Sequence, residues 1–250
     1  VSIGYFILLK IDSLRQLTRR DWLWLGAIGL SFGVHWYLYF LSIKLATAST
    51  AVVGVSSYGV QIILISIIFH GRPIYKTDIL AVLAVLAGTL TIIPEFSMSN
   101  DVTKGLLVAI ISAFFYAILP SFHQKNAHIN GNVRSFGQFM FAGLFFAVLF
   151  PYANFDLPAF DWIGLLYLGV ICTLIGHTLW IQVVTQVSAV AASLMYYLSV
   201  PLAILMSVLV LNEPLTLNLM VGTALILAGN CLGLFHQIKS RSFWLVKTVE

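Results

Sequence analysis

The chain has 250 residues, of which 60% are hydrophobic and only 9% are charged, and its mean hydropathy is +0.98. A soluble domain carries roughly 25% charged residues, so the composition excludes a soluble globular protein and indicates an integral membrane protein. The formal net charge is +4, but the loops lack the interleaved basic and aromatic residues of a nucleic-acid surface. We therefore expect the lipid bilayer as a partner and no nucleic acid.

Apolar segments follow one another along the chain, separated by short polar loops. They cover residues 1–9, 22–42, 47–69, 78–94, 105–124, 134–153, 162–184, 187–211 and 217–236. The last eight are long enough to span a hydrocarbon core about 30 Å thick, whereas nine residues rise only roughly 14 Å. We expect the chain to begin inside a helix, as in an N-terminally truncated sequence. The fold class predicted is an all-α polytopic membrane protein.

The basic residues test this segmentation, because successive loops must lie on alternate sides of the membrane. Two of the 13 basic residues, Lys44 and Lys104, fall on one side. The other side collects Lys10, Arg15, Arg19, Arg20, Arg72, Lys76, Lys125, Arg134, Lys239, Arg241 and Lys247. Such an asymmetry marks the cytoplasmic side. We expect a multi-pass protein of the cytoplasmic (inner) membrane with its C-terminus in the cytoplasm.

An internal repeat relates the two halves of the chain. The matching pairs are Asp21-Trp22 with Asp161-Trp162, His35 with His177, and Gly88 with Gly229, at offsets of 140, 142 and 141. The helix before Arg72 ends on the positive side, whereas its counterpart before Glu213 ends on the opposite side, so the halves are inverted. Inverted repeats are typical of secondary transporters. We predict a first repeat over 1–100 that lacks its first helix, a second repeat over 101–240 and a cytoplasmic tail over 241–250.

The second half contains a recognisable set of motifs. The small-residue run from Ser188 to Ser193 follows the Trp-led helix, as the Ala/Ser/Thr turn from Leu45 to Ala51 does in the first half, and then come Pro201, Asn212-Glu213-Pro214, Gly222 and Gly229. Together they resemble the EamA-type domain of the drug/metabolite transporter superfamily, over essentially the whole chain. The first half departs from this pattern, with Gly59 in place of Pro201 and Gly71-Arg72-Pro73 in place of Asn212-Glu213-Pro214.

The resemblance implies a ten-helix inverted-repeat bundle with cytoplasmic termini that carries small metabolites, amino acids or amphipathic drugs. Measured against that pattern, the chain lacks the first helix and part of the second. The helices that follow would surround a central cavity.

Polar and aromatic side chains at membrane depth supply the candidate substrate site, since they are costly in lipid unless buried against protein or water. Helical spacing places His35 with Tyr39, Tyr58 with Gln61, and His177 with Trp180 on common faces. We predict that the solute binds to His35, Tyr39, Tyr58, Gln61, Tyr116, His177, Trp180 and Tyr197. Aromatic faces with a few hydrogen-bonding groups suit an amphipathic solute or its ammonium group. The alternative is that the aromatic residues only anchor the membrane interface.

The repeat-equivalent histidines, His35 and His177, have two interpretations. Either their titration near pH 6.5 couples transport to protons, or each only hydrogen-bonds a neighbouring helix. Every carboxylate falls in a loop or at a helix end, so the sequence leaves open proton coupling, exchange and facilitated diffusion. His123 and His128 are expected to be solvated at the cytoplasmic interface. No metal site and no cofactor are expected.

Gly59, Pro120 and Pro201 are the predicted gating residues, because glycine loosens a helix and proline removes one of its hydrogen bonds. The alternative is static close packing of helices at small residues. Replacing Pro201 by Ala and measuring the transport rate would distinguish the two.

These features predict a secondary transporter, with export as the expected direction, for neutral or zwitterionic metabolites such as amino acids, or for amphipathic drugs. Phosphorylated or strongly anionic solutes are disfavoured, because the spans contain neither a phosphate-binding loop nor a buried basic pair. The sequence leaves open whether the protein forms a homodimer. The competing hypotheses are an intramembrane serine-type hydrolase that pairs Ser56 with His177, and a channel or a non-transporting scaffold.

Overall fold

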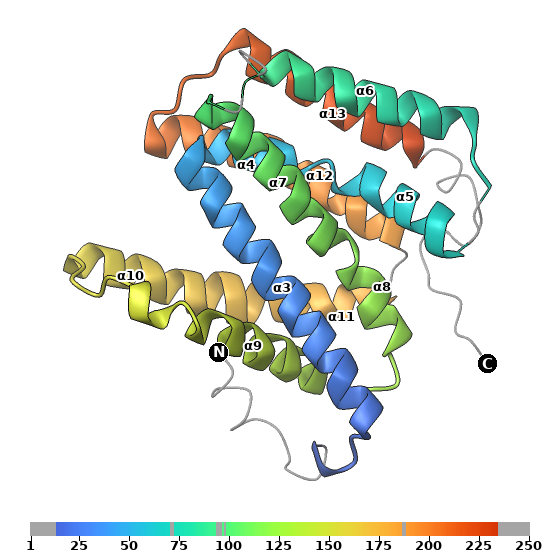
Figure 1. The fold of residues 1–250 in the computed structure, drawn as a ribbon, viewed down its shortest axis with the longest axis vertical. Helices are drawn as coiled ribbons and strands as arrows, with labels where there is room; N and C mark the ends of the chain where they lie inside the picture. The colour runs from blue at the N-terminus through green and yellow to red at the C-terminus, as the bar shows by residue number, and fades with distance from the viewer. Residues whose placement is uncertain (1–13, 71–72, 94–96, 98, 187–188, 235–250) are drawn as a thin grey trace. The chain divides into compact units, whose positions relative to one another are not determined.

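A computed structural model describes residues 14–70, 73–93, 97, 99–186 and 189–234 of the chain (Figure 1). Among these residues all regular structure is helical. The helices are α3 (Arg19–Leu45), α4 (Ala48–Val55), α5 (Tyr58–His70), α6 (Lys76–Ile92), α7 (Asp101–Ala117), α8 (Leu119–Lys125), α9 (Gly131–Ala147), α10 (Ala159–Tyr167), α11 (Thr178–Gln186), α12 (Ala189–Leu211) and α13 (Leu217–Gly233). A 3-10 turn, η1 (Phe150–Tyr152), follows α9, and a stretch of wider π-type turns, η2 (Leu168–His177), joins α10 to α11.

The predicted all-α membrane fold is confirmed, and each of the eight predicted spans coincides with helix. Four described segments are long and apolar enough to cross a membrane: Arg19–Leu45, Ala48–Ile65, Asp101–Lys125 and Ala159–Gln186. The span predicted at 134–153 is shorter than expected, because α9 ends at Ala147. The segment predicted at 1–9 lies outside the described residues.

Two of the predicted spans are interrupted. The segment 47–69 divides into α4 and α5 at Ser56 and Ser57, and the segment 105–124 divides into α7 and α8 at Ile118. Pro120 lies two residues after the second interruption and has no N–H to donate into the helical ladder. Hydropathy reports the length of an apolar segment but not such breaks.

The chain divides into two compact units. Unit 1 takes residues up to Val34 together with Leu119–Gln186, and unit 2 takes His35–Ile118 together with residues from Val187 onward. The chain passes from one unit to the other inside α3 and again between α7 and α8. Each unit therefore collects segments from both predicted repeats, whose boundaries stay a prediction.

The core of unit 2 contains the antiparallel pair α6 and α13, which lie side by side (Figure 1). A Cβ on Gly222 would come 2.6 Å from the Gly88 carbonyl oxygen, and one on Gly229 would come 2.9 Å from the Ala81 carbonyl oxygen. Only glycine permits such close backbone approach, which is a common way of packing helices in lipid. Around this pair lies a core of aliphatic side chains from α4, α5, α7 and α12.

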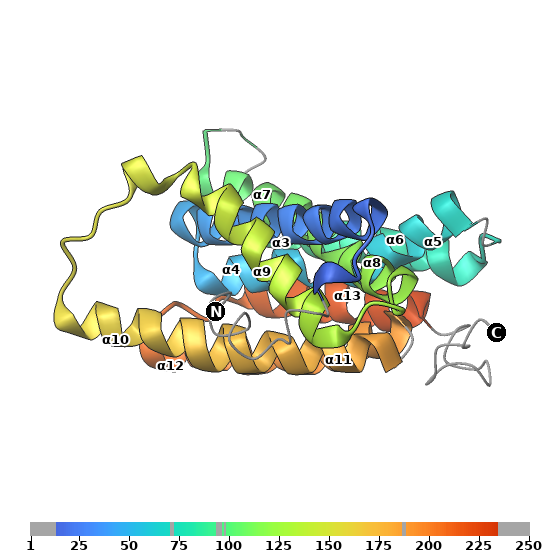
Figure 2. The ribbon, with the colours of Figure 1, turned by 90° about the horizontal axis from the view of Figure 1, so that it is seen from below.

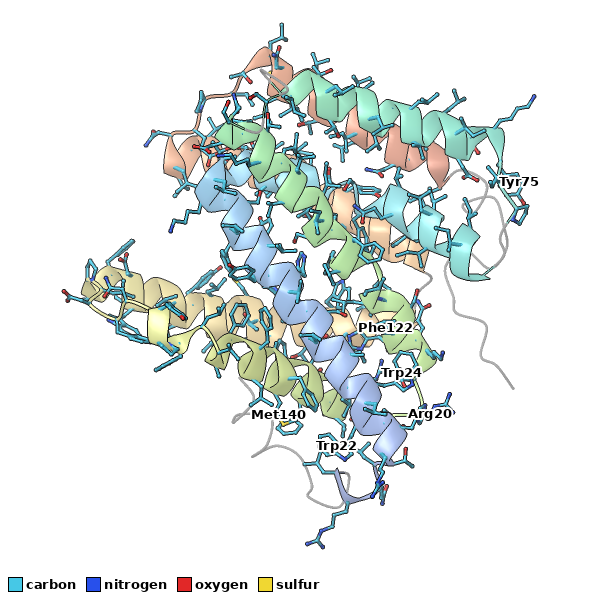
Figure 3. All side chains as sticks on the ribbon, in the orientation of Figure 1. Arg20, Trp22, Trp24, Tyr75, Phe122 and Met140 are labelled. Carbon is cyan, nitrogen blue, oxygen red and sulfur yellow. The ribbon has the colours of Figure 1, made fainter. Side chains whose placement is uncertain are left out.

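Unit 1 is built from the first part of α3, from α8 and α9, and from the extended helical segment formed by α10, η2 and α11 (Figure 2). A Cβ on Gly29 of α3 would lie 2.8 Å from the Gln138 carbonyl oxygen of α9, so these helices also pack closely. Trp24 meets the Phe122 ring edge-on at 5.3 Å (Figure 3). The Lys125 ammonium lies 4.7 Å above the Trp24 ring, which is a cation–π contact.

Candidate functional site

An aromatic cluster lies inside unit 2, where α3, α5, α7 and α12 each contribute at least one ring. Its members are His35, Tyr39, Tyr58, Tyr116 and Tyr196. His35 stacks on Tyr116 with ring centroids 4.7 Å apart. Tyr116 in turn packs against Tyr58 at 4.9 Å and Tyr196 at 5.8 Å. The structure thus brings together four residues of the predicted site and adds Tyr196.

His35 is held in this cluster by α7. Its Nδ1 lies 2.8 Å from the Ser112 hydroxyl and 3.1 Å from the Ser112 carbonyl oxygen, and the Ser112 hydroxyl lies 2.8 Å from the His35 carbonyl oxygen. The hydroxyl donates its single proton to that carbonyl, so we assign the Nδ1–H tautomer, which donates to Ser112. The bonds fix the ring plane against which Tyr39 and Tyr116 stack. His35 therefore orients the cluster.

Gln61 lies apart from these rings, and Tyr197 meets them only at Tyr196, edge-on with ring centroids 6.3 Å apart. Gln61 lines an apolar groove of about 830 Å³ between α5, α6 and α7, and its Nε2 donates to the Ser57 hydroxyl at 3.0 Å and to the Ile110 carbonyl at 2.9 Å. Tyr197 packs in a small aliphatic core with Ile63 and Leu234. Both residues pack between helices around the cluster. Of the predicted pair Tyr58 and Gln61, only Tyr58 faces the other rings.

The other predicted pair, His177 and Trp180, belongs to unit 1. The His177 ring meets Phe32 edge-on at 4.9 Å and Trp180 at 6.4 Å. Trp180 also contacts the ring of His123, at 5.8 Å. The repeat-equivalent histidines thus have different surroundings, since His35 is bonded to a serine whereas His177 packs among aromatic rings.

His123 is not solvated, contrary to the sequence expectation. It is fully buried, and its Nε2 lies 2.9 Å from Gln138 Oε1. Arg134, also expected at the solvated interface, is buried, and it donates to the carbonyls of His123 at 2.8 Å and Ile129 at 3.0 Å. These bonds close the turn between α8 and α9. His128, in contrast, is exposed and pairs with Asp21 at 3.0 Å.

Asn230 of α13 is a functional candidate that the sequence reasoning missed. Its side chain is fully buried, and it donates to the Ser56 carbonyl at 2.7 Å and accepts from the Val60 N–H at 3.0 Å. It thus bridges the break between α4 and α5. The signal that would have found it is an amide side chain within a predicted span, where polar groups are costly.

Glu213 forms a second feature that was missed, which we call the Glu213 clamp. Its carboxylate accepts from the Ala48 N–H at 2.7 Å, from the Ser49 N–H at 2.9 Å and from the Ser49 hydroxyl at 2.6 Å. The Ser49 hydroxyl also contacts the Ser207 hydroxyl. Asn212, with φ of 53°, ends α12 in the left-handed conformation and turns the chain toward α4. The loop after α12 thereby caps the start of α4, a helix of the first repeat.

The environment of Glu213 favours its charged form. Burial by itself would raise the pKa of the carboxyl, but the hydrogen bonds from Ser49, Ala48 and Ser207 outweigh it and hold the pKa below its ordinary value. The N-terminal end of a helix also favours a negative charge. A cavity of about 260 Å³ lies beside the clamp.

The predicted gating residues lie at two breaks and inside one continuous helix. Gly59 follows the break between α4 and α5, and a Cβ there would overlap the Tyr197 hydroxyl. Pro120 lies just after the point where the chain passes from unit 2 to unit 1. Pro201 lies within α12, which continues on both sides of it.

The surroundings of Ser56 do not suit a nucleophile. Its hydroxyl donates to the Val53 carbonyl at 2.6 Å and is fully buried, so its proton is bound within its own helix. Among the residues that the structure describes, no group of three His, Cys, Asp or Glu side chains could hold a metal ion.

Comparison with known protein families identifies one family that the chain matches. The sequence profile of the EamA-like transporter family matches residues 1–93 and again 103–235. No curated protein matches the chain significantly. Among solved structures, one titled "Crystal structure of protein" is similar with a TM-score of 0.64 and 20% identity, and the match covers 94% of this chain and 83% of that chain. That likeness concerns the fold.

Proposed function

Because the chain belongs to the EamA-like transporter family, we propose that it is a secondary transporter that exports small neutral or zwitterionic metabolites, or amphipathic drugs, by alternating access. The family consists of transporters and not of enzymes, so the hydrolase hypothesis is set aside. The proposal places the protein in the cytoplasmic membrane with the C-terminus in the cytoplasm, as the distribution of its basic residues supports.

The aromatic cluster is the observation that supports this class of solute. Its rings come from four helices, and one hydrogen-bonded imidazole stands among four phenols. The surface is uncharged and offers ring faces that favour apolar bodies and ammonium groups. No basic side chain belongs to the cluster, so it suits a phosphorylated solute poorly.

The Glu213 clamp supports a gating role at one end of unit 2. It ties a loop of the second repeat to a helix of the first, so its release would free the N-terminal end of α4. Alternating access requires contacts of this kind that form in one state and break in the other.

Solute counterflow in proteoliposomes tests the proposal. The full chain is reconstituted, and uptake of radiolabelled phenylalanine, leucine, an amphipathic organic cation and a hexose phosphate is measured with and without the same solute inside. A carrier gives uptake that is accelerated by internal solute, and we expect this for the first three compounds. Acceleration by the hexose phosphate alone would contradict the proposed solute class, and uptake without acceleration would indicate a channel.

The cluster is tested with Tyr116→Leu, which removes the ring that contacts three others. Aromatic pairs contribute about 0.5–1.5 kcal/mol each, so the variant should lose about tenfold in counterflow at low solute concentration. Phe114→Leu is the matched control, because Phe114 lies on the same helix and lines the apolar groove instead. Equal losses in both variants would remove the cluster from the solute pathway.

A further inference from the structure

We propose that Asn230 is a positioning residue for the aromatic cluster. Its side-chain amide binds the carbonyl and the N–H that would otherwise form one backbone hydrogen bond, and it thereby keeps α4 and α5 separate at the turn that carries Tyr58. The first repeat thus loses a backbone hydrogen bond to an asparagine of the second repeat, as α12 loses one at Pro201 while it remains a single helix. The consequence for transport rests on the proposed function, whereas the backbone effect does not.

The two groups that Asn230 binds are normally partners of each other. In an α-helix the N–H of residue i donates to the carbonyl of residue i−4, which pairs Val60 with Ser56. Here the Ser56 carbonyl accepts from Asn230 Nδ2 at 2.7 Å, and the Val60 N–H donates to Asn230 Oδ1 at 3.0 Å. The amide is inserted into the ladder at this point, and α4 ends at Val55 while α5 begins at Tyr58.

Insertion of an amide is an inexpensive way to open a helix in lipid. A backbone group left without a partner in a hydrocarbon environment costs several kcal/mol. Asparagine is matched to the opened pair because it offers one donor and one acceptor on adjacent atoms. If Asn230 is replaced by an apolar side chain, the least costly arrangement is for Val60 to bond Ser56 again, which joins α4 to α5.

The opened turn determines where Tyr58 points. Tyr58 lies between Ser56 and Val60, whose backbone groups Asn230 binds. Its ring packs against Tyr116 with ring centroids 4.9 Å apart and against Tyr196 at 5.6 Å. Gly59 leaves space for the Asn230 side chain, since a Cβ at this position would come 3.0 Å from Asn230 Oδ1 and would overlap the Tyr197 hydroxyl. A continuous helix would rotate Tyr58 away from these partners.

The second half lacks a backbone hydrogen bond near the corresponding place. The 141-residue offset of Gly88 and Gly229 pairs Val60 with Pro201, and the 142-residue offset of His35 and His177 pairs Gly59 with it. Proline has no N–H, so the corresponding hydrogen bond is absent there as well. The counterpart of Asn230 itself is Thr89, whose hydroxyl donates to the Val85 carbonyl of its own helix at 2.8 Å.

Asn230→Leu and the double variant Asn230→Leu/Val60→Pro test the proposal. Val60→Pro removes the N–H that would bond the Ser56 carbonyl and close the ladder. Spin labels at Lys44 and Ile68, both exposed and both in unit 2, report the position of the end of α5. The native Cys172 and Cys231 are replaced by serine, and Asn218→Leu on the exposed side of α13 is the matched control.

We expect Asn230→Leu to shift the interspin distance and the double variant to restore it. α5 has 13 residues, so it is about 20 Å long, and a change in kink of about 20° moves its far end by roughly 7 Å. An unchanged distance in Asn230→Leu overturns the proposal. Failure of Val60→Pro to restore the distance, or to restore folding if the single variant misfolds, overturns it too, because Asn230 would then act through packing alone.

Transport provides a separate readout. Phenylalanine counterflow should fall about tenfold in Asn230→Leu, mainly through a higher KM, and should recover by at least half in the double variant. Full counterflow in Asn230→Leu despite a shifted distance would contradict the positioning role. If the unmodified protein shows no phenylalanine counterflow, the solute assignment fails, while the spin-label distances still decide whether Asn230 holds the break.

Discussion

Removing the charge of Glu213 should release the N-terminal end of α4. In Glu213→Gln one side-chain oxygen remains as an acceptor, but the other is replaced by an NH₂ group that faces the N–H of Ala48 or of Ser49. Hydrogen bonds to a charged group contribute about 1.5–3 kcal/mol each. Because Glu213 is only half-buried, we take the lower end, which corresponds to about a tenfold larger population of the released state.

Cysteine labelling measures that population. Thr50 lies on α4 beside the clamp, lines the adjacent cavity and is 6% exposed, so Thr50→Cys should react slowly with a maleimide. In the Glu213→Gln background the rate should rise about tenfold. Asp101→Asn is the control, since Asp101 forms an exposed pair with Lys104 and such pairs contribute little. Equal rates with and without Glu213 would refute the clamp.

The same assay has a defined pH dependence. The pKa of Glu213 is lowered in the folded protein from its ordinary value of 4.5. The clamp therefore contributes its full stabilisation above pH 4.5 and loses it as the pH falls through the lower, folded-state pKa. The labelling rate of Thr50→Cys is divided by the rate in the Glu213→Gln background, because this ratio cancels the pH dependence of the thiolate. The ratio should rise in that acidic range, and a rise between pH 6 and pH 8 would assign the effect to another group.

Three further substitutions, the first with a matched control, test the packing around the cluster and the turn of unit 1. Gly59→Ala should lower the free energy of unfolding by about 1–3 kcal/mol through overpacking. The control is Gly143→Ala, where an added Cβ meets nothing within 4 Å, and it should leave the free energy of unfolding unchanged or raise it by up to about 1 kcal/mol. Thermal unfolding in detergent measures both variants. Ser112→Ala should destabilise by about 1–3 kcal/mol and broaden the His35 imidazole signals in NMR spectra. Arg134→Met leaves the two backbone carbonyls that it binds without a donor, so a loss of at least about 3 kcal/mol is expected in the same unfolding assay.

The sequence was sufficient to predict the helices because hydropathy depends on which segments lie in lipid, and each predicted span from 22 onward is helical over most of its described residues. It was not sufficient to predict the breaks. The interruption at Ser56 and Ser57 depends on Asn230, a residue 170 positions from Val60 in the chain. The local sequence offers only Gly59 as a hint, and glycine is equally common where helices pack closely.

The candidate site was predicted in part for the same reason. Helical spacing correctly brought His35 to Tyr39, since both lie on the unbroken α3. Spacing also placed Tyr58 beside Gln61, but Tyr58 is the first residue of α5 and joins the aromatic cluster, while Gln61 lines the apolar groove. Repeat symmetry suggested one role for His35 and His177, yet the two histidines belong to different units.

Divergence between the repeats has a thermodynamic consequence. In a perfectly symmetric inverted repeat the two access states have equal free energies, so any contact that occurs in one repeat only will bias the equilibrium. The 141-residue offset relates Glu213 to Arg72, and an arginine cannot accept hydrogen bonds from a helix N-terminal end. If the protein works by the proposed alternating access, a clamp of about 1.5 kcal/mol whose carboxylate has no acidic counterpart at position 72 gives roughly a tenfold preference for the state closed there. The unloaded transporter is therefore expected to rest with the Glu213 end shut.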